Sequence, residues 1–139
     1  MLLPMKQVLF VCFGNSCRSP MAEGFANHYG KEWLTAHSAG TNPAGFIMPS
    51  TVEAMQEKGI DISQQTSKSL ATIQLKLMDW IVVMEPSIAR FVPRNLPGLE
   101  TLIWPIPDPV GQSMEIYRQV RDQIELSVLE FLDIVRKSS

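Results

Sequence analysis

The segment from Cys12 to Pro20 holds the side chains with the clearest capacity for chemistry, in the order Cys-Phe-Gly-Asn-Ser-Cys-Arg-Ser-Pro. A cysteine thiolate is a strong nucleophile, and an arginine guanidinium presents parallel N–H groups that match two oxygens of a tetrahedral oxyanion. Cys12 and Arg18 supply this pair, and the hydroxyl of Ser19 is expected to donate a hydrogen bond to the sulfur. The spacing therefore predicts a site at which Cys12 attacks the central atom of a bound oxyanion.

The residues around this motif predict a strand, a short loop and a helix. Gln7–Cys12 is a continuous apolar run rich in β-forming residues, typical of a strand that is covered on both faces. Ser19 is a favourable N-cap and Pro20 is favoured at the first helical position, so we expect a helix to begin there and to end at Gly30. The positive end of this helix favours anion binding and the thiolate form of the cysteine.

The loop has the residue types that such a turn requires. Gly14 permits a backbone turn that a side chain would obstruct, and Asn15 tolerates the left-handed conformation better than most residues. Main-chain N–H groups of the loop then converge on one point. The residues expected to surround the oxyanion are Phe13, Gly14, Asn15, Ser16, Cys17 and Ser19.

A second candidate segment, Pro105–Pro109, carries one acidic residue among its prolines. Each proline biases the preceding residue away from helix, so we expect an extended, stiff loop. Asp108 would be held there by its two proline neighbours, where a carboxylic acid can protonate a leaving oxygen and then activate the hydrolytic water as a base. Aspartate is also common beside proline in ordinary turns, so the residues alone leave both roles open.

Strand and helix patterns alternate along the chain, which predicts an α/β fold. The further strand patterns lie at Leu34–Ala39, Asp79–Met84 and Leu99–Ile103, and the further helix patterns at Ser50–Lys58, Pro86–Phe91 and Met114–Lys137. Ser50 and Glu53 match a capping box. The last helix has one apolar face, made of Ile116, Val120, Ile124, Val128, Phe131, Leu132 and Val135.

This alternation predicts one domain over residues 1–139, with a parallel sheet covered by helices on both faces. Ligands of such sheets bind beyond the carboxyl ends of the strands. Both candidate segments follow strands, Cys12–Pro20 after the first and Pro105–Gly111 after the fourth. We therefore expect them to share one site.

Composition excludes several other classes of protein. The chain has 139 residues, 45% of them hydrophobic and 19% charged, and a formal net charge of −2, which argues against a nucleic-acid surface. No apolar run approaches the ~20 residues of a membrane span, and the N-terminus has no secretory pattern, so a cytoplasmic protein is expected. The two cysteines make no disulfide framework, and His28 and His37 have no metal-ligand spacing with them, so no metal is expected.

Four stretches of the chain resemble the low-molecular-weight protein tyrosine phosphatase superfamily, which includes the arsenate reductases of the same fold. They are Val11–Gly24, His37–Thr41, Lys58–Ser63 and Trp104–Pro109. The resemblance implies a four-stranded parallel sheet in the order 2-1-3-4 and no cofactor. It also implies roles for site residues: Cys12 as nucleophile, Arg18 as phosphate clamp, Asp108 as general acid, and Asn15, Ser19, Ser38 and Glu23 as supports of the loop.

Departures from the family patterns bear on which reaction the chain performs. Val110 and Gly111 follow the aspartate-proline pair where many of these phosphatases carry tyrosine, and Val83–Val92 lacks the two further cysteines of thioredoxin-coupled arsenate reductases. We expect a cysteine-dependent phosphatase that acts on a phosphorylated protein or a small phosphomonoester. The alternative is an arsenate reductase that uses an external small thiol or a glutaredoxin-type reductant. A non-catalytic oxyanion-binding module is a third class, which would need neither the thiol nor the acid.

Two further residues have open roles at this stage. Cys17 is a spectator, a reversible disulfide partner of Cys12, or a thiol that resolves an arseno-thiolate adduct. Arsenate reductases of the superfamily bind potassium near the equivalents of Asn15, Glu23 and Ser38. Lys68 stands where an acidic ligand of that ion is expected, so its ammonium group is a candidate replacement.

Overall fold

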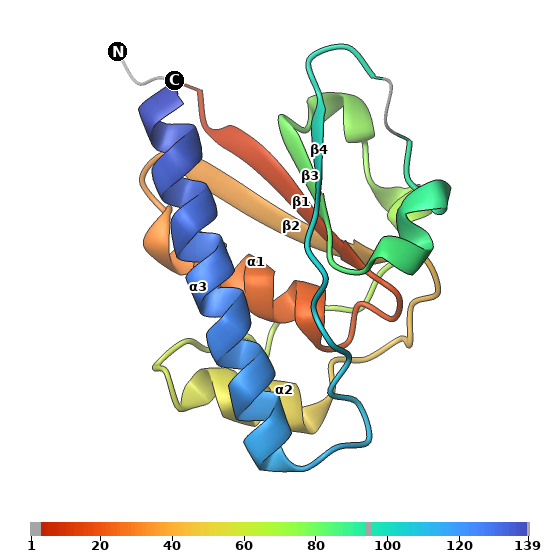
Figure 1. The fold of residues 1–139 in the computed structure, drawn as a ribbon, viewed down its shortest axis with the longest axis vertical. Helices are drawn as coiled ribbons and strands as arrows, with labels where there is room; N and C mark the ends of the chain where they lie inside the picture. The colour runs from red at the N-terminus through yellow and green to blue at the C-terminus, as the bar shows by residue number, and fades with distance from the viewer. Residues whose placement is uncertain (1–3, 94–95, 139) are drawn as a thin grey trace.

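Four parallel strands form the centre of the computed structural model, which describes residues 4–93 and 96–138 (Figure 1). The strands are β1 (Lys6–Cys12), β2 (Leu34–Gly40), β3 (Trp80–Val83) and β4 (Glu100–Ile103). They are ordered β2-β1-β3-β4, and each neighbouring pair is parallel. The predicted fold class and strand order are therefore confirmed, and β1 lies between two partners as its continuous apolar sequence requires.

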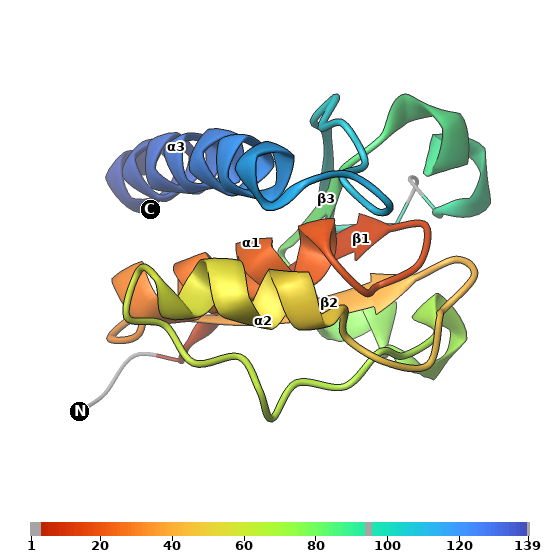
Figure 2. The same ribbon diagram turned by 90° about the horizontal axis from the view of Figure 1, so that it is seen from below.

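One face of the sheet is covered by three α-helices: α1 (Arg18–Tyr29), α2 (Pro49–Gln56) and α3 (Met114–Ser138). Val8 and Phe10 of β1 point to this face and join a buried cluster with the apolar side chains of the helices. The predicted apolar face of α3 supplies buried residues such as Ile124 and Val128, and α3 lies across α1 (Figure 2). The long helix is therefore part of the core.

The opposite face of the sheet is covered by short 3₁₀ helices. They are η1 (Leu70–Thr72), η2 (Leu75–Leu77) and η3 (Pro86–Phe91). Leu9 and Val11 of β1 point to this face and pack with apolar residues from this region, including Ile88. The third of these helices matches the predicted helix at Pro86–Phe91, while the sequence patterns did not reveal the first two.

The predicted starts of two helices are corrected by the structure. Ser19 is not an N-cap, because α1 begins at Arg18 with Cys17 at the N-cap position and without a side-chain capping bond. The capping box of Ser50 and Glu53 is also absent, since α2 begins at Pro49 after Met48. Ser19 instead lies inside α1, where its hydroxyl contacts Asn15 and Cys12 of the loop.

An arginine–glutamate cluster joins α2 to α3. Glu57, at the end of α2, accepts hydrogen bonds from Arg118 at 2.9–3.1 Å and from Arg121 at 2.6 Å. Arg121 is buried and also donates to the carbonyl of Ala54 at 3.0 Å. The hydrogen bonds from Arg118 and Arg121 lower the pKa of Glu57 from 4.5 to about 2.

No helix in the described part of the chain is long and apolar enough to cross a membrane.

Because of the arginine–glutamate cluster, we expect the free energy of unfolding to depend on pH in the acidic range. The pKa of Glu57 is lower in the folded chain than in the unfolded chain. Its ionised carboxylate therefore contributes fully to the free energy of unfolding above pH 4.5, and this contribution is lost as the pH falls toward about 2. Glu57→Gln should therefore have a lower melting temperature than the wild type at neutral pH, and the difference should shrink toward pH 2. Thermal melts across this range test it, with Glu130→Gln on the exposed side of α3 as the control. An unchanged difference at every pH would contradict the assignment.

Candidate active site

The loop between β1 and α1 surrounds a pocket of about 370 Å³ at the carboxyl end of the sheet. The structure brings most of the predicted site residues to this pocket. Its lining comprises Cys12, Phe13, Gly14, Ser16, Cys17, Arg18, Asn42, Ala44, Asp108 and Val110. The two candidate segments of the sequence therefore meet at one place, and the segment after β2 adds a third wall.

Asn15 gives the loop its shape. It has a φ of 45°, and it is the one non-glycine residue with positive φ in residues 4–93 and 96–138. Its buried amide donates to Ser19 Oγ at 2.8 Å and to Ser38 Oγ at 2.9 Å, and its Oδ1 accepts from the backbone N–H of Lys68 at 2.8 Å. These bonds satisfy every buried polar group of the side chain and hold the left-handed conformation.

Gly40 is the glycine that the close packing of this loop requires. A Cβ added there would lie 2.7 Å from the carbonyl oxygen of Phe13, because the end of β2 runs directly against the loop. A Cβ at Gly14 would meet the flexible hydroxyl of Ser16 at 3.3 Å, and Gly14 does not have positive φ. The predicted need for glycine at position 14 is therefore weaker than the need at position 40.

A chain of hydrogen bonds leads from Glu23 to the sulfur of Cys12. Ser38 donates to Glu23 at 2.7 Å, and Ser19 Oγ lies 3.0 Å from Cys12 Sγ. Ser19 Oγ accepts from the Asn15 amide, and when Cys12 is a thiolate, which has no proton to give, the Ser19 hydroxyl is the donor to the sulfur. A hydroxyl in this orientation stabilises a thiolate. Burial raises the pKa of Glu23, and the hydrogen bond from Ser38 opposes that effect.

Lys68 contacts this network through its main chain. Its backbone N–H donates to Asn15, while its ammonium group donates to the carbonyl oxygen of Thr66 at 2.8 Å. Its positive charge also acts on the carboxyl group of Glu23, where it opposes the effect of burial on the pKa of Glu23. The ammonium group thus interacts electrostatically with one of the three residues named as potassium ligands, in the direction that the hypothesis of an ammonium in place of the ion requires.

Arg18 is buried and lies between two acidic residues. Its Nη1 donates to the carbonyl of Ile106 at 3.1 Å, and its Nη2 donates to Glu85 Oε1 at 2.8 Å. Asp108 Oδ2 lies 3.8 Å from the same nitrogen, at the mouth of the pocket, and its side chain is 54% exposed. The other oxygen of Asp108 accepts from the backbone N–H of Val110 at 3.0 Å. The carboxyl group is thus oriented by the loop yet open to solvent.

The two cysteines have different surroundings. Both are buried and neither forms a disulfide. Burial raises the pKa of Cys17 to about 12, although a hydrogen bond with Thr51 lowers it in part. Cys17 is therefore a protonated thiol at neutral pH, whereas Cys12 faces the hydroxyl of Ser19.

Glu85 is a site residue that the sequence did not reveal, as are Asn42 and Ala44 of the pocket lining. It follows β3 and accepts from two groups of the loop region, Arg18 Nη2 at 2.8 Å and the backbone N–H of Phe13 at 3.2 Å. Ser87 donates to its second oxygen at 2.9 Å. Its place just beyond the carboxyl end of a buried strand beside β1 is the signal that could have identified it.

Comparisons with known proteins agree with this geometry. The family model for the low molecular weight phosphotyrosine protein phosphatases matches residues 7–139. Arsenate reductase 2 of Staphylococcus saprophyticus is 36% identical over 129 residues, which is 92% of this chain and 97% of that protein.

Two solved structures are also similar. A low molecular weight protein tyrosine phosphatase from T. tengcongensis has a TM-score of 0.80 at 30% identity, covering 92% of this chain and 98% of that one. An arsenate reductase in a phosphate-binding state has a TM-score of 0.77 at 35% identity, covering 93% of this chain and 98% of that one. The chain belongs to the low-molecular-weight phosphotyrosine protein phosphatase family, a family of enzymes. The phosphatases and arsenate reductases among these relatives do not distinguish between the two reactions.

The position of Glu85 leads to a prediction about anion binding. Its negative charge competes with a bound oxyanion for Arg18, while a glutamine would keep an oxygen in the same place. Glu85→Gln should therefore bind inorganic phosphate roughly three- to tenfold more tightly, as expected for a single charge removed beside an anion site. Titration calorimetry measures this, with the exposed Glu100→Gln as the control. Weaker binding by Glu85→Gln would show that the carboxylate instead positions Arg18 for the anion.

Proposed function

We propose that this chain is a cysteine-dependent phosphatase that hydrolyses phosphomonoesters, either phosphotyrosine in proteins or aryl phosphates, through a cysteinyl-phosphate intermediate. The observation that supports this most directly is the meeting of a thiol, a guanidinium and a carboxyl group in one pocket. Anion binding alone needs no nucleophile and no acid. We therefore assign Cys12, Arg18 and Asp108 to the reaction itself.

In the first step, the thiolate of Cys12 attacks phosphorus, and the bond from phosphorus to the ester oxygen breaks. The main-chain N–H groups of the loop and Arg18 hold the other phosphate oxygens, which carry the negative charge. Asp108 gives its proton to the leaving oxygen, so an alcohol or phenol departs as a neutral molecule.

In the second step, water attacks the phosphorus of the cysteinyl phosphate, and the bond from phosphorus to sulfur breaks. The carboxylate of Asp108 now takes a proton from the water, which restores its acid form as inorganic phosphate leaves. The hydroxyl of Ser19, directed at the sulfur, stabilises the thiolate that is released.

Arsenate reduction is the alternative, supported by relatives such as the 36% identical arsenate reductase. The thiolate of Cys12 would attack arsenic, and one arsenic–oxygen bond would break, its oxygen leaving as water once protonated. An external thiol would then attack that sulfur, forming a mixed disulfide while the electron pair of the broken bond reduces arsenic to arsenite. The chain has two cysteines, so Cys17 is the alternative attacking thiol, and an external thiol would then reduce the Cys12–Cys17 disulfide that forms.

Turnover of a chromogenic aryl phosphate, measured beside arsenate-dependent oxidation of an added thiol, separates the two reactions. We expect hydrolysis of the ester, and we expect Cys12→Ser to abolish it while inorganic phosphate still binds. Negligible hydrolysis together with rapid arsenate-dependent thiol oxidation would overturn the proposal in favour of the reductase.

The role assigned to Asp108 predicts a dependence on the leaving group. Asp108→Asn should lower kcat by roughly 10² to 10⁴ for esters of poorly acidic alcohols, the usual range for lost acid catalysis. The loss should shrink for activated aryl esters, because their leaving groups depart without a proton. Measuring kcat over a series of leaving groups tests this. Equal losses across the series would show that Asp108 is not the acid.

Cys17 is expected to have little part in hydrolysis. Because its thiol is protonated and buried, Cys17→Ser should keep hydrolysis of an aryl phosphate within a few-fold of the wild-type rate. It should, however, make inactivation by peroxide irreversible, because the sulfenic acid on Cys12 can no longer condense with a neighbouring thiol to a disulfide. The experiment oxidises both forms, adds dithiothreitol and compares the recovered activity. Equal recovery would show that Cys17 does not protect Cys12.

A further inference from the structure

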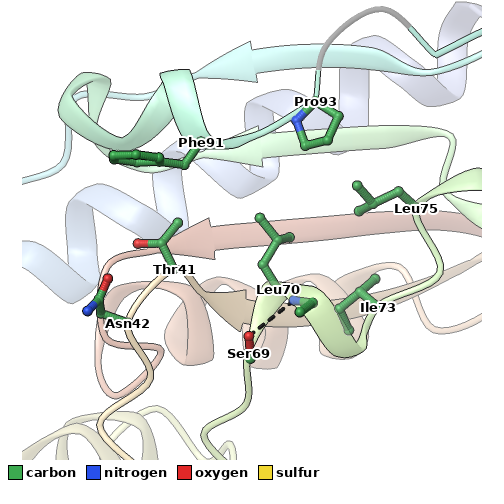
Figure 3. Close-up of a pocket in the computed structure, with 9 residues that line it drawn as sticks. Thr41, Asn42, Ser69, Leu70, Ile73, Leu75, Phe91 and Pro93 are labelled. Atoms are coloured by element: carbon green, nitrogen blue, oxygen red, sulfur yellow. Dashed lines mark hydrogen bonds between the residues drawn. The ribbon is translucent and has the colours of Figure 1, made fainter.

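A second cavity, of about 520 Å³, lies on the face of the sheet that carries the 3₁₀ helices (Figure 3). We call it the Leu70 cavity. It is lined by η1, the first residue of η2, η3 and the residues after β2, among them Thr41, Asn42, Leu70, Ile73, Leu75 and Phe91. None of the described residues that line it is charged, and its volume falls within the usual range for ligand pockets. The proposed reaction makes no use of this cavity.

The Leu70 cavity adjoins the active-site pocket, because Asn42 lines both. The backbone N–H groups of Thr41 and Asn42 donate to the carbonyl oxygens of Cys12 at 3.2 Å and Phe13 at 2.8 Å. The wall between the two cavities is thus fixed to the catalytic loop. A segment of substrate that extends from the active site past Asn42 would meet the lining of the second cavity.

The route between the two cavities is polar at one end and apolar at the other. Asn42, which lines both cavities, is exposed, so its side-chain amide is available to a peptide backbone. Beyond it the lining is apolar: Leu70 points toward the segment that carries Phe91, whose side chain is 57% exposed (Figure 3). A polar group followed by an apolar chamber suits a peptide backbone with an apolar side chain.

We propose that the Leu70 cavity receives an apolar side chain of a phosphoprotein substrate, next to the phosphorylated residue in the active site. This inference rests on the proposed phosphatase function and adds a preference among its protein substrates. A charged side chain would lose its hydration in the uncharged cavity without gaining a partner. An aliphatic side chain such as leucine would gain the burial of its own surface and that of Phe91.

The test compares phosphotyrosine peptides that differ only in the position of one leucine, each paired with a peptide that has glutamate there. A small aryl phosphate, which cannot reach the second cavity, is measured beside them. We expect the wild type to prefer leucine at one position by about tenfold in kcat/KM, the effect of burying one aliphatic side chain.

Two variants alter the cavity with little risk to folding. Phe91→Ala removes an exposed ring, and Ala71→Glu adds a charge at an exposed lining residue. Both should lose the preference for leucine while hydrolysis of the aryl phosphate stays within about twofold. Ala71→Lys should instead favour the glutamate peptide. Leu77→Ala, an exposed leucine of η2 outside the cavity, is the matched control and should keep the preference for leucine.

The outcomes distinguish a failure of the proposed phosphatase function from a failure of the cavity proposal. Absence of aryl phosphate turnover in the wild type would overturn the phosphatase function itself. Turnover of the aryl phosphate with equal kcat/KM for leucine and glutamate at every position would overturn the cavity proposal alone. An equal loss for peptides and aryl phosphate in Phe91→Ala would also overturn it, because the cavity would then support the loop and not the substrate. Loss of the preference in Leu77→Ala would do the same.

Discussion

The hydrogen bonds of one buried asparagine hold the catalytic loop in the shape on which the rest of the site depends. A φ of 45° costs a non-glycine residue roughly 1 kcal/mol, and Asn15 adopts it because all its side-chain bonds require that position. The same bonds hold Ser19 against the sulfur of Cys12, where its hydroxyl donates when that sulfur is a thiolate. A single backbone conformation therefore sets the shape of the loop and, under the proposed function, favours the nucleophilic form of Cys12.

The fold supplies the partners of Asn15 from distant parts of the chain. Ser38 comes from β2 and Lys68 from the segment before η1, and both lie against the loop because β2 pairs with β1 up to Gly40. A side chain at Gly40 would push β2 away from Phe13 and break this arrangement. The order of the strands is thus a condition for the geometry of the loop as well as for the core.

Local sequence signals predicted much of this structure and failed where contacts are long-range. The apolar run of β1, the conformation of Asn15 and the apolar face of α3 are encoded by neighbouring residues, and each appears in the structure. The capping role predicted for Ser19 is wrong, because α1 begins one residue before it and its hydroxyl contacts Asn15 and Cys12 instead. Glu85 was missed because its partners, Arg18 and Phe13, are far away in sequence, and only its place beyond the carboxyl end of β3 indicated a role in the site. The first two 3₁₀ helices are too short to show periodicity.

Under the proposed function, the charges around Arg18 explain how one arginine would serve both binding and catalysis. Glu85 holds the Nη2 side of Arg18 from within the fold, while Asp108 approaches the same nitrogen from the solvent-exposed mouth. An oxyanion that enters the pocket competes with both carboxylates for the guanidinium. Under the proposed function, its arrival releases Asp108 from Arg18, and the freed carboxyl group is then the one placed to exchange a proton with the leaving oxygen. The pairing of Asp108 with Arg18 would thus couple substrate binding to the position of the acid.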